Sequence, residues 1–225
     1  MHIADLHPWP ETYPEAAYQQ QLLVSGVYPY NVLSDSISTV AGVDVSYKKH
    51  DNSFFAGIVI LSLPDLEVIE EQTATATVTF PYIPGLLSFR ELPVLLEAFR
   101  KVETVPDLVL VDGQGLAHPR RFGLASHLGI WLDLPTIGCA KSRLCGDFDE
   151  PGEKKGECSD LMMLDGRVGQ VVRTRDRVKP MFISPGHKID VETASKLALQ
   201  CCTRYRMPEP TRLAHHLANR ARLAG

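Results

Sequence analysis

A run of four apolar residues that ends in an acid and a glycine, Leu108-Val109-Leu110-Val111-Asp112-Gly113, most restricts how this chain can fold. Four apolar residues in succession are typical of a central strand whose two faces are both covered. A carboxylate at its end lies at the edge where open α/β sheets place their functional groups. Because a charge beside a buried strand is unfavourable unless it is paired or binds a cation, Asp112 is a candidate metal ligand. The alternative is that Asp112 caps a turn through Gly113.

The segments on either side of this run predict a mixed α/β sheet. Three strand-like segments precede it, and their links are too short for parallel crossovers, so these strands should be antiparallel neighbours. The next two strands are separated by helices and should run parallel. This order is that of a ribonuclease H-like mixed β-sheet flanked by helices, and we expect residues 1–225 to form a single domain. The predicted strands cover residues 39–47, 54–63, 67–80, 107–112, 135–140, 169–174 and 181–184, and the predicted helices cover residues 12–25, 88–102, 121–132, 191–202 and 211–223, with a loop over 147–157.

Charge and cysteine usage narrow the classes of function. The formal net charge is -4, but acidic residues outnumber basic ones in residues 1–112, and the reverse holds over residues 113–225. A basic second half fits phosphate contacts beside a carboxylate cluster, although solvated surface charge gives the same pattern. The five cysteines are scattered without a CxxC pair, which favours reduced thiols in the cytoplasm over a disulfide or zinc framework. The sequence has neither a secretory signal nor a membrane-spanning run, so we expect a soluble, cytoplasmic protein with no membrane partner.

Asp112 is one of three acids in positions that suit a metal-dependent nuclease. Asp44 interrupts an apolar strand, and Glu91 opens a predicted helix. Carboxylates from different elements that meet at one sheet edge can hold two cations about 3.5–4 Å apart, one for the attacking water and one for the leaving oxygen. We therefore predict that Asp44, Glu91 and Asp112 are catalytic metal ligands. Glu91 has a local alternative, because an acid is also favourable at a helix N-terminus.

Around these acids, the chain resembles the endonuclease V family, the deoxyinosine 3′ endonucleases. The resemblance runs from about residue 40 to residue 216 in the family's order and spacing. Two small departures are Cys139, where a valine is common, and the N-terminal 38 residues, which match only loosely. The matching segments are GVDVS (42–46), FPYIPGLLSFRE (80–91), DGQGLAHPR (112–120), PTIGCAKSRL (135–144), SPGH (184–187) and PEPTR (208–212).

The resemblance implies a specific activity and its cofactor. It implies a ribonuclease H-like fold and hydrolysis of the second phosphodiester bond 3′ to a deaminated base, chiefly hypoxanthine, in DNA. It also implies Mg²⁺ as the cofactor, with Mn²⁺ as a substitute, and it matches Asp44, Glu91 and Asp112 to the family's metal-binding acids. We expect a monomer whose partner is DNA that contains deoxyinosine or another deaminated base.

The segment Pro81-Tyr82-Ile83-Pro84 is expected to contact the substrate. Two prolines fix φ and restrict the residues before them, so Tyr82 is presented on a stiff loop. A rigid aromatic side chain at a loop tip suits a wedge that fills the gap left by a base turned out of the stack. The resemblance gives Tyr82 this strand-separating role. The alternative is a proline-rich turn whose tyrosine packs on the surface.

A pocket selective for hypoxanthine should offer a donor to O6, an acceptor to N1–H and no room for bulk at C2. Backbone groups can supply these contacts where side chains are absent. The alternative is that the glycines serve only tight turns. The candidate pocket residues are Gly85, Gly113, Gly115 and Gly138, with Leu87 packing on the base.

Basic and imidazole groups complete the predicted site. Lys141 could contact the scissile phosphate or orient the attacking water, which the family pattern favours over a solvated surface lysine. His118 could reach a phosphate, and His215 could approach the metal site from the last helix, although a lone histidine is more often structural. Backbone contacts to DNA are expected from Arg90, Arg120, Arg121, Arg143 and Arg212.

Two rival functions stay open at the level of sequence. The same fold could act mainly on inosine in RNA, because the sequence does not show whether a 2′-hydroxyl is tolerated. A binding module that kept the fold and lost the chemistry is the second rival. The complete set of acids speaks against it.

Overall fold

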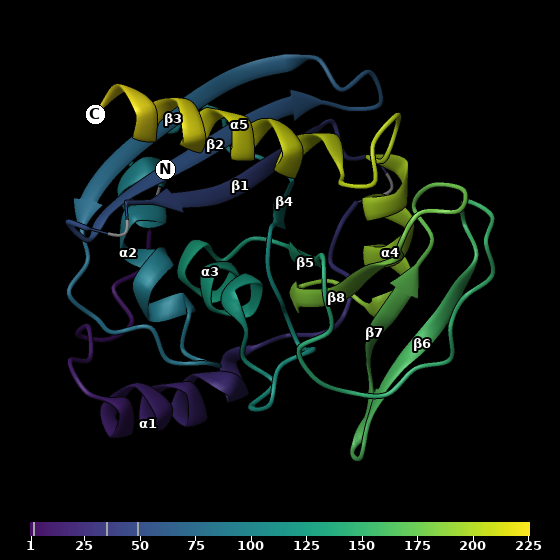
Figure 1. Cartoon of the computed structure of the whole chain (residues 1–225), viewed down its shortest axis with the longest axis horizontal. Coiled ribbons are helices and arrows are strands. Elements are labelled where there is room, and N and C mark those ends of the chain that lie inside the picture. The colour runs from purple at the N-terminus through teal and green to yellow at the C-terminus, as the bar shows by residue number, and fades with distance from the viewer. Residues whose placement is uncertain (2, 35, 49) are drawn as a thin grey trace.

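The computed structural model of the chain describes residues 1, 3–34, 36–48 and 50–225. Its strands form one sheet in the order β3-β2-β1-β4-β5-β8-β7-β6, flanked by helices (Figure 1). The strands are β1 (Thr39–Tyr47), β2 (Ser53–Ser62), β3 (Val68–Thr77), β4 (Leu108–Val111), β5 (Thr136–Ala140), β6 (Cys158–Met163), β7 (Gly166–Val172) and β8 (Met181–His187). The helices are α1 (Tyr13–Leu23), the short 3₁₀ helix η1 (Val24–Gly26), α2 (Ser88–Phe99), α3 (Leu124–Leu132), α4 (Val191–Gln200) and α5 (Glu209–Ala224).

The strand directions are those of the predicted mixed sheet. β1, β2 and β3 form an antiparallel meander, whereas β1 pairs with β4 and β4 pairs with β5 in parallel. The register aligns Val43 of β1 with Val111 of β4. The residues that follow these two valines are Asp44 and Asp112. Parallel pairing therefore brings both acids to the same edge of the sheet, although they are far apart in the sequence.

Helices cover both faces of the sheet, and the central strand β4 is buried between them. Val109 and Val111 belong to a core cluster that includes α2 and α3. Leu108 and Leu110 point the other way, into a cluster that includes α4 and α5. Figure 1 shows α5 lying along β1 and β2 and α2 and α3 on the other side. The alternation confirms the prediction of a strand covered on both faces.

A glycine in β1 lets α5 lie unusually close to the sheet. A Cβ atom on Gly42 would stand only 2.0 Å from the backbone carbonyl carbon of Pro210, at the start of α5. Any side chain there would push the helix away from the strand. Because α5 starts in contact with β1, the side chain of His215 in its second turn comes over Asp44, two residues beyond Gly42.

The strand β6 is the element that the sequence did not predict. Residues 169–174 and 181–184 were expected as strands and correspond to β7 and β8, but Cys158–Met163 was not recognised. β6 is an edge strand, with Leu161 as its single buried residue. An edge strand needs little apolar surface, so its sequence carries almost no periodic signal. All five cysteines carry free thiols, and every helix among the described residues is too short or too polar to cross a membrane.

Candidate functional site

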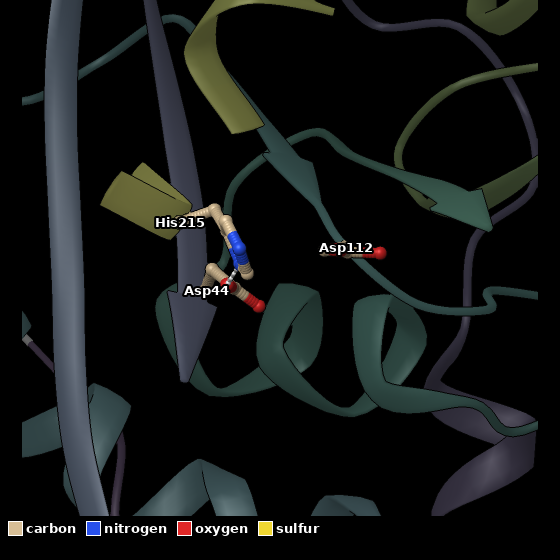
Figure 2. Close-up of side chains that lie close together, drawn as sticks. All are labelled: Asp44, Asp112 and His215. Atoms are coloured by element: carbon tan, nitrogen blue, oxygen red, sulfur yellow. Dashed lines mark hydrogen bonds and ion pairs between the residues drawn. The ribbon is translucent and has the colours of Figure 1, made fainter. Parts of the chain in front are cut away.

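Asp44, Asp112 and His215 meet at the edge of the sheet where β4 ends beside β1 (Figure 2). One ligand atom from each of the three side chains can be chosen so that all lie within 4.8 Å of one another. The Nδ1 atom of His215 is hydrogen-bonded to Oδ2 of Asp44 at 2.6 Å. Carboxylate oxygens and an imidazole nitrogen in this arrangement can hold a divalent cation.

Burial and mutual repulsion disfavour the negative charge of this cluster. Burial, followed by the charge of Asp112, raises the pKa of Asp44 to about 6, and the hydrogen bond from His215 only partly offsets this. Asp112 has a cationic neighbour of its own, because Lys141 forms an ion pair with its Oδ2 atom. The Lys141 side chain is 42% exposed, so it can be reached from solvent beside the cluster. Buried carboxylates that lie this close together are unfavourable in their ionised form, and such groups are typical of a site that binds a cation.

Glu91 lies next to this cluster. It is in the first turn of α2. Burial raises its pKa well above the usual value, and the charges of Asp44 and Asp112 raise it further, which places Glu91 within electrostatic reach of both. Its carboxylate is not part of the group whose atoms lie within 4.8 Å. The sheet thus brings two of the three predicted acids into direct proximity, and α2 holds the third beside them.

A line of hydrogen bonds behind His215 fixes the orientation of its ring. The Nε2 atom of His215 is 3.0 Å from Nδ2 of Asn219, one turn further along α5. Ser46 donates to Oδ1 of Asn219 at 2.9 Å, and Arg222 donates to Ser46 at 2.8 Å. His215 was expected to approach from the last helix, but Asn219 and Ser46 were not singled out. The one sequence signal is the four-residue spacing of His215 and Asn219, which puts them on one helix face.

A cavity of about 350 Å³ opens beside the acids and includes Asp112 in its wall. Its size suits a single base. The side chain of Tyr82 is 69% exposed at its rim, and Leu87 is 36% exposed. The residues that sequence reasoning assigned to substrate binding and that line this cavity are Tyr82, Ile83, Pro84, Gly85, Leu87, Gly113 and His118, together with Lys141.

Three of the expected substrate contacts lie outside the cavity wall. Pro81 is exposed and does not line it. Gly115 and Gly138 are buried behind it, where close backbone contact leaves no space for a side chain: a Cβ atom on Gly115 would be 2.0 Å from the carbonyl oxygen of Pro185, and one on Gly138 would be 2.5 Å from the backbone nitrogen of Gly115. These two glycines let backbone segments pack closely together, which differs from both the pocket role and the tight-turn role expected from the sequence, and they take no part in the base pocket proposed below.

The arginines expected to contact DNA are mostly engaged within the protein. Arg90 donates to the carbonyl oxygen of Phe80, and Arg121 is paired with Asp165. Arg212 forms an ion pair with Glu209. Arg143 also donates to the carbonyl oxygen of Gly146 and pairs with the exposed Asp147, but half of its side chain is exposed and it lines the cavity. Arg143 is therefore the arginine best placed to meet a phosphate.

Comparisons with known proteins identify the family of this site. The family model described as Endonuclease V matches residues 23–216. The chain is 47% identical over 213 residues to Endonuclease V of Nostoc punctiforme, covering 95% of this chain and 96% of that protein. The chain belongs to the endonuclease V family. The activity expected from the sequence, that of a deoxyinosine 3′ endonuclease, is thereby confirmed.

Solved structures of endonuclease V proteins have the same fold. The crystal structure of Endonuclease V from Streptomyces avermitilis is 39% identical to this chain and superposes with a TM-score of 0.90, covering 100% of this chain and 99% of the other. That of Endonuclease V from Ciona intestinalis is 29% identical, with a TM-score of 0.84 and coverage of 96% and 99%. It was crystallised with a 24mer DNA containing an inosine followed by a ribo-adenosine. These likenesses confirm the predicted mixed-sheet fold for this endonuclease V.

Proposed function

We propose that this endonuclease V hydrolyses the second phosphodiester bond 3′ to a deaminated base in DNA, chiefly hypoxanthine, with Mg²⁺ at the carboxylate cluster. The observation that carries the proposal is the position of Asp112, which belongs both to the cluster and to the wall of a base-sized cavity. A base held in that cavity would have its own strand within reach of the acids.

The donor set fits a hard divalent cation. Asp44 and Asp112 offer carboxylate oxygens, the ligands that Mg²⁺ prefers, and the raised pKa of Asp44 indicates negative charge that a cation would relieve. Asp44 and Asp112 would hold the cation, and Glu91 would complete its surroundings from α2. Mn²⁺ should substitute, because it also accepts oxygen and imidazole ligands. When bound, the cation supplies positive charge for activating water and for stabilising the leaving oxygen.

The side chains around the cation position the substrate. His215 donates to Asp44 and keeps that carboxylate oriented. Lys141, released from Asp112 when the cation neutralises the acid, would contact the scissile phosphate. Water is the nucleophile in this scheme, so no covalent intermediate with the protein forms. Lys141 and Arg143 would contribute binding that weakens as salt concentration rises.

The cavity would receive the deaminated base after it leaves the stack. Tyr82, exposed on the loop at the cavity rim, would fill the space that the base vacates. Leu87 would pack against the base, and the backbone at Gly85 and Gly113 would face it without side chains in the way. Hypoxanthine carries an N1–H group that adenine lacks, so backbone donors and acceptors can distinguish the two bases.

Inosine in RNA is the second candidate substrate. It is favoured by the Ciona intestinalis relative, whose bound strand contains a ribo-adenosine directly after the inosine. Cleavage rates on matched strands that carry either deoxyinosine or riboinosine would rank the two substrates. Faster cleavage of the ribo strand would reassign the main function to RNA.

One experiment tests the proposed function directly. An end-labelled duplex with a single deoxyinosine is incubated with the protein and Mg²⁺, and the nick is mapped to one nucleotide. The expected product ends at the second phosphodiester bond 3′ to the lesion, and EDTA should prevent its formation. A nick elsewhere, or equal cleavage of an undamaged duplex, would contradict the proposal. We also propose a monomer that acts in the cytoplasm, which size-exclusion chromatography and fractionation of the source cells would check.

A further inference from the structure

Three side chains donate hydrogen bonds to one carbonyl group in the loop that carries Tyr82. The carbonyl oxygen of Gly85 accepts from Nε2 of Gln20 at 3.0 Å, from Nε2 of His118 at 3.0 Å and from Nη2 of Arg120 at 2.9 Å. Gly85 has φ of +80°, a left-handed conformation that favours glycine. The loop is therefore held at its most unusual backbone position by side chains from two other segments.

Gln20 links these segments, and it comes from the N-terminal helix α1. Its side chain is 1% exposed, and each of its polar atoms has a partner. Besides Gly85, its Nε2 atom donates to the carbonyl oxygen of Phe122 at 3.2 Å, and its Oε1 atom accepts from Nε of Arg120. A fully buried amide is unfavourable unless it is bonded in this way. The hydrogen bonds of Gln20 therefore join α1, the loop that carries Tyr82 and residues 118–122.

The helix α1 contacts the rest of the protein through Ala16, which packs in the main core cluster, and through the polar contact of Gln20. Its buried residues are Ala16 and Gln20, whereas its large side chains Tyr13, Tyr18 and Leu22 are exposed. Helices normally dock through an apolar stripe. Because α1 buries no large apolar side chain, we explain the burial of Gln20 by the loop around Gly85 that its hydrogen bond holds in place. The matched family region begins at residue 23, so Gln20 lies outside it.

The ring of His118 is held in the tautomer that donates to the carbonyl oxygen of Gly85. Its Nδ1 atom accepts from the backbone N–H of Arg120 at 3.2 Å, so its hydrogen is on Nε2, the atom that faces Gly85. Burial, followed by the charge of Arg120, lowers the pKa of His118 to about 4. The ring is therefore neutral at physiological pH and donates one hydrogen bond, to Gly85.

We propose that Gln20, His118 and Arg120 form a clamp on Gly85, and that Gln20 is a positioning residue for recognition of the damaged base. This rests on the proposed function of the cavity. The loop has few backbone bonds of its own, because Pro81 and Pro84 have no N–H group; the described turn bond is from Leu86 to Ile83 at 2.9 Å. The clamp supplies the missing restraint, so that the loop holds its part of the cavity wall in place with Tyr82 exposed at the rim.

Clamping matters because recognition requires a preformed loop. A loop that had to be ordered during binding would weaken substrate affinity, and a pocket wall displaced by about 1 Å would lose discrimination between bases. Gln20 and Arg120 do not need to touch the substrate for this effect. Their loss should raise KM and reduce the preference for deoxyinosine over deoxyadenosine, while kcat at saturating substrate changes little.

The test compares neighbouring residues of the same type. Gln20→Leu removes the buried amide, and Gln21→Leu makes the same change one position along α1, where the side chain is exposed. Hydrogen exchange of the segment 82–90 should speed up about tenfold in Gln20→Leu and stay unchanged in Gln21→Leu. The KM for a deoxyinosine duplex should rise about tenfold only in Gln20→Leu.

A second variant keeps the test decisive if Gln20→Leu does not fold. Arg120→Lys keeps the charge but replaces the two separate nitrogens that donate to Gln20 and Gly85 by a single one, and its control is Arg100→Lys at the exposed end of α2. Loop exchange and base preference in Arg120→Lys that match the control would overturn the clamp. The proposed function and the clamp can fail separately. If the wild type did not nick deoxyinosine, but Arg120→Lys or Gln20→Leu still sped up hydrogen exchange of the loop, the proposed function would be overturned and the clamp would be supported.

Discussion

Replacing Asp44 by asparagine should abolish nicking and, in the absence of divalent cations, make the protein more stable. Asparagine has the size of the protonated acid and lacks its charge. The pKa of Asp44 is raised from 3.8 to about 6, by burial first and by Asp112 second. That rise corresponds to about 3 kcal/mol of unfavourable free energy when the group is ionised in the folded protein, taken as an upper value. The variant is relieved of this penalty.

The gain in stability of Asp44→Asn over the wild type should increase as pH rises. Between the usual value of 3.8 and about 6, the folded protein holds a proton on Asp44 that the unfolded chain has released. The wild type is therefore stabilised by this group at low pH and loses that stabilisation as pH rises through about 6. Asp44→Asn should exceed the wild type in stability at pH 7.5, and the difference should close near pH 4.

Thermal unfolding in EDTA measures both effects. For a chain of this length, each kcal/mol moves Tm by about 2–4 °C, so a rise of several degrees is expected at pH 7.5. Added Mg²⁺ should stabilise the wild type and have much less effect on the variant. Asp65→Asn, on the exposed turn after β2, is the control and should change stability by less than about 0.5 kcal/mol. The reasoning would be refuted if Asp44→Asn were no more stable than the wild type at pH 7.5 and the difference in stability did not change with pH. Ionised Asp44 would then carry no penalty for a bound cation to relieve.

Three further substitutions and one titration test other parts of the site. Asp112→Asn should retain binding to a deoxyinosine duplex in a gel-shift assay and lose nicking; a variant that still nicks would undo its catalytic assignment. Tyr82→Ala should slow cleavage of duplex DNA about tenfold more than cleavage of a single strand, because a single strand has no stack to separate. Gly113→Val should abolish inosine cleavage with fold and Mg²⁺ stabilisation intact: its Cβ atom would fit at 3.5 Å from Leu124, but its methyl groups would reach the cavity. The logarithm of DNA affinity should fall linearly with the logarithm of salt concentration, and a flat response would argue against the phosphate contacts.

Local pattern determined much of this protein. The apolar run 108–111 predicted a strand covered on both faces, which the structure shows for β4. The acids that end or interrupt strands predicted a candidate metal site, and the motifs around them predicted the family. These features were readable because strand periodicity and motif spacing are properties of neighbouring residues.

Tertiary structure decided the direct contacts between residues that lie far apart in the sequence. The hydrogen bond between Asp44 and His215 spans 171 positions, and the bond between Gln20 and Arg120 spans 100. Both depend on how closely a helix packs on its neighbours, which for α5 is set by the absence of a side chain at Gly42. Local sequence preference carries no information about such distances, because packing between elements is determined by the shape of both surfaces together.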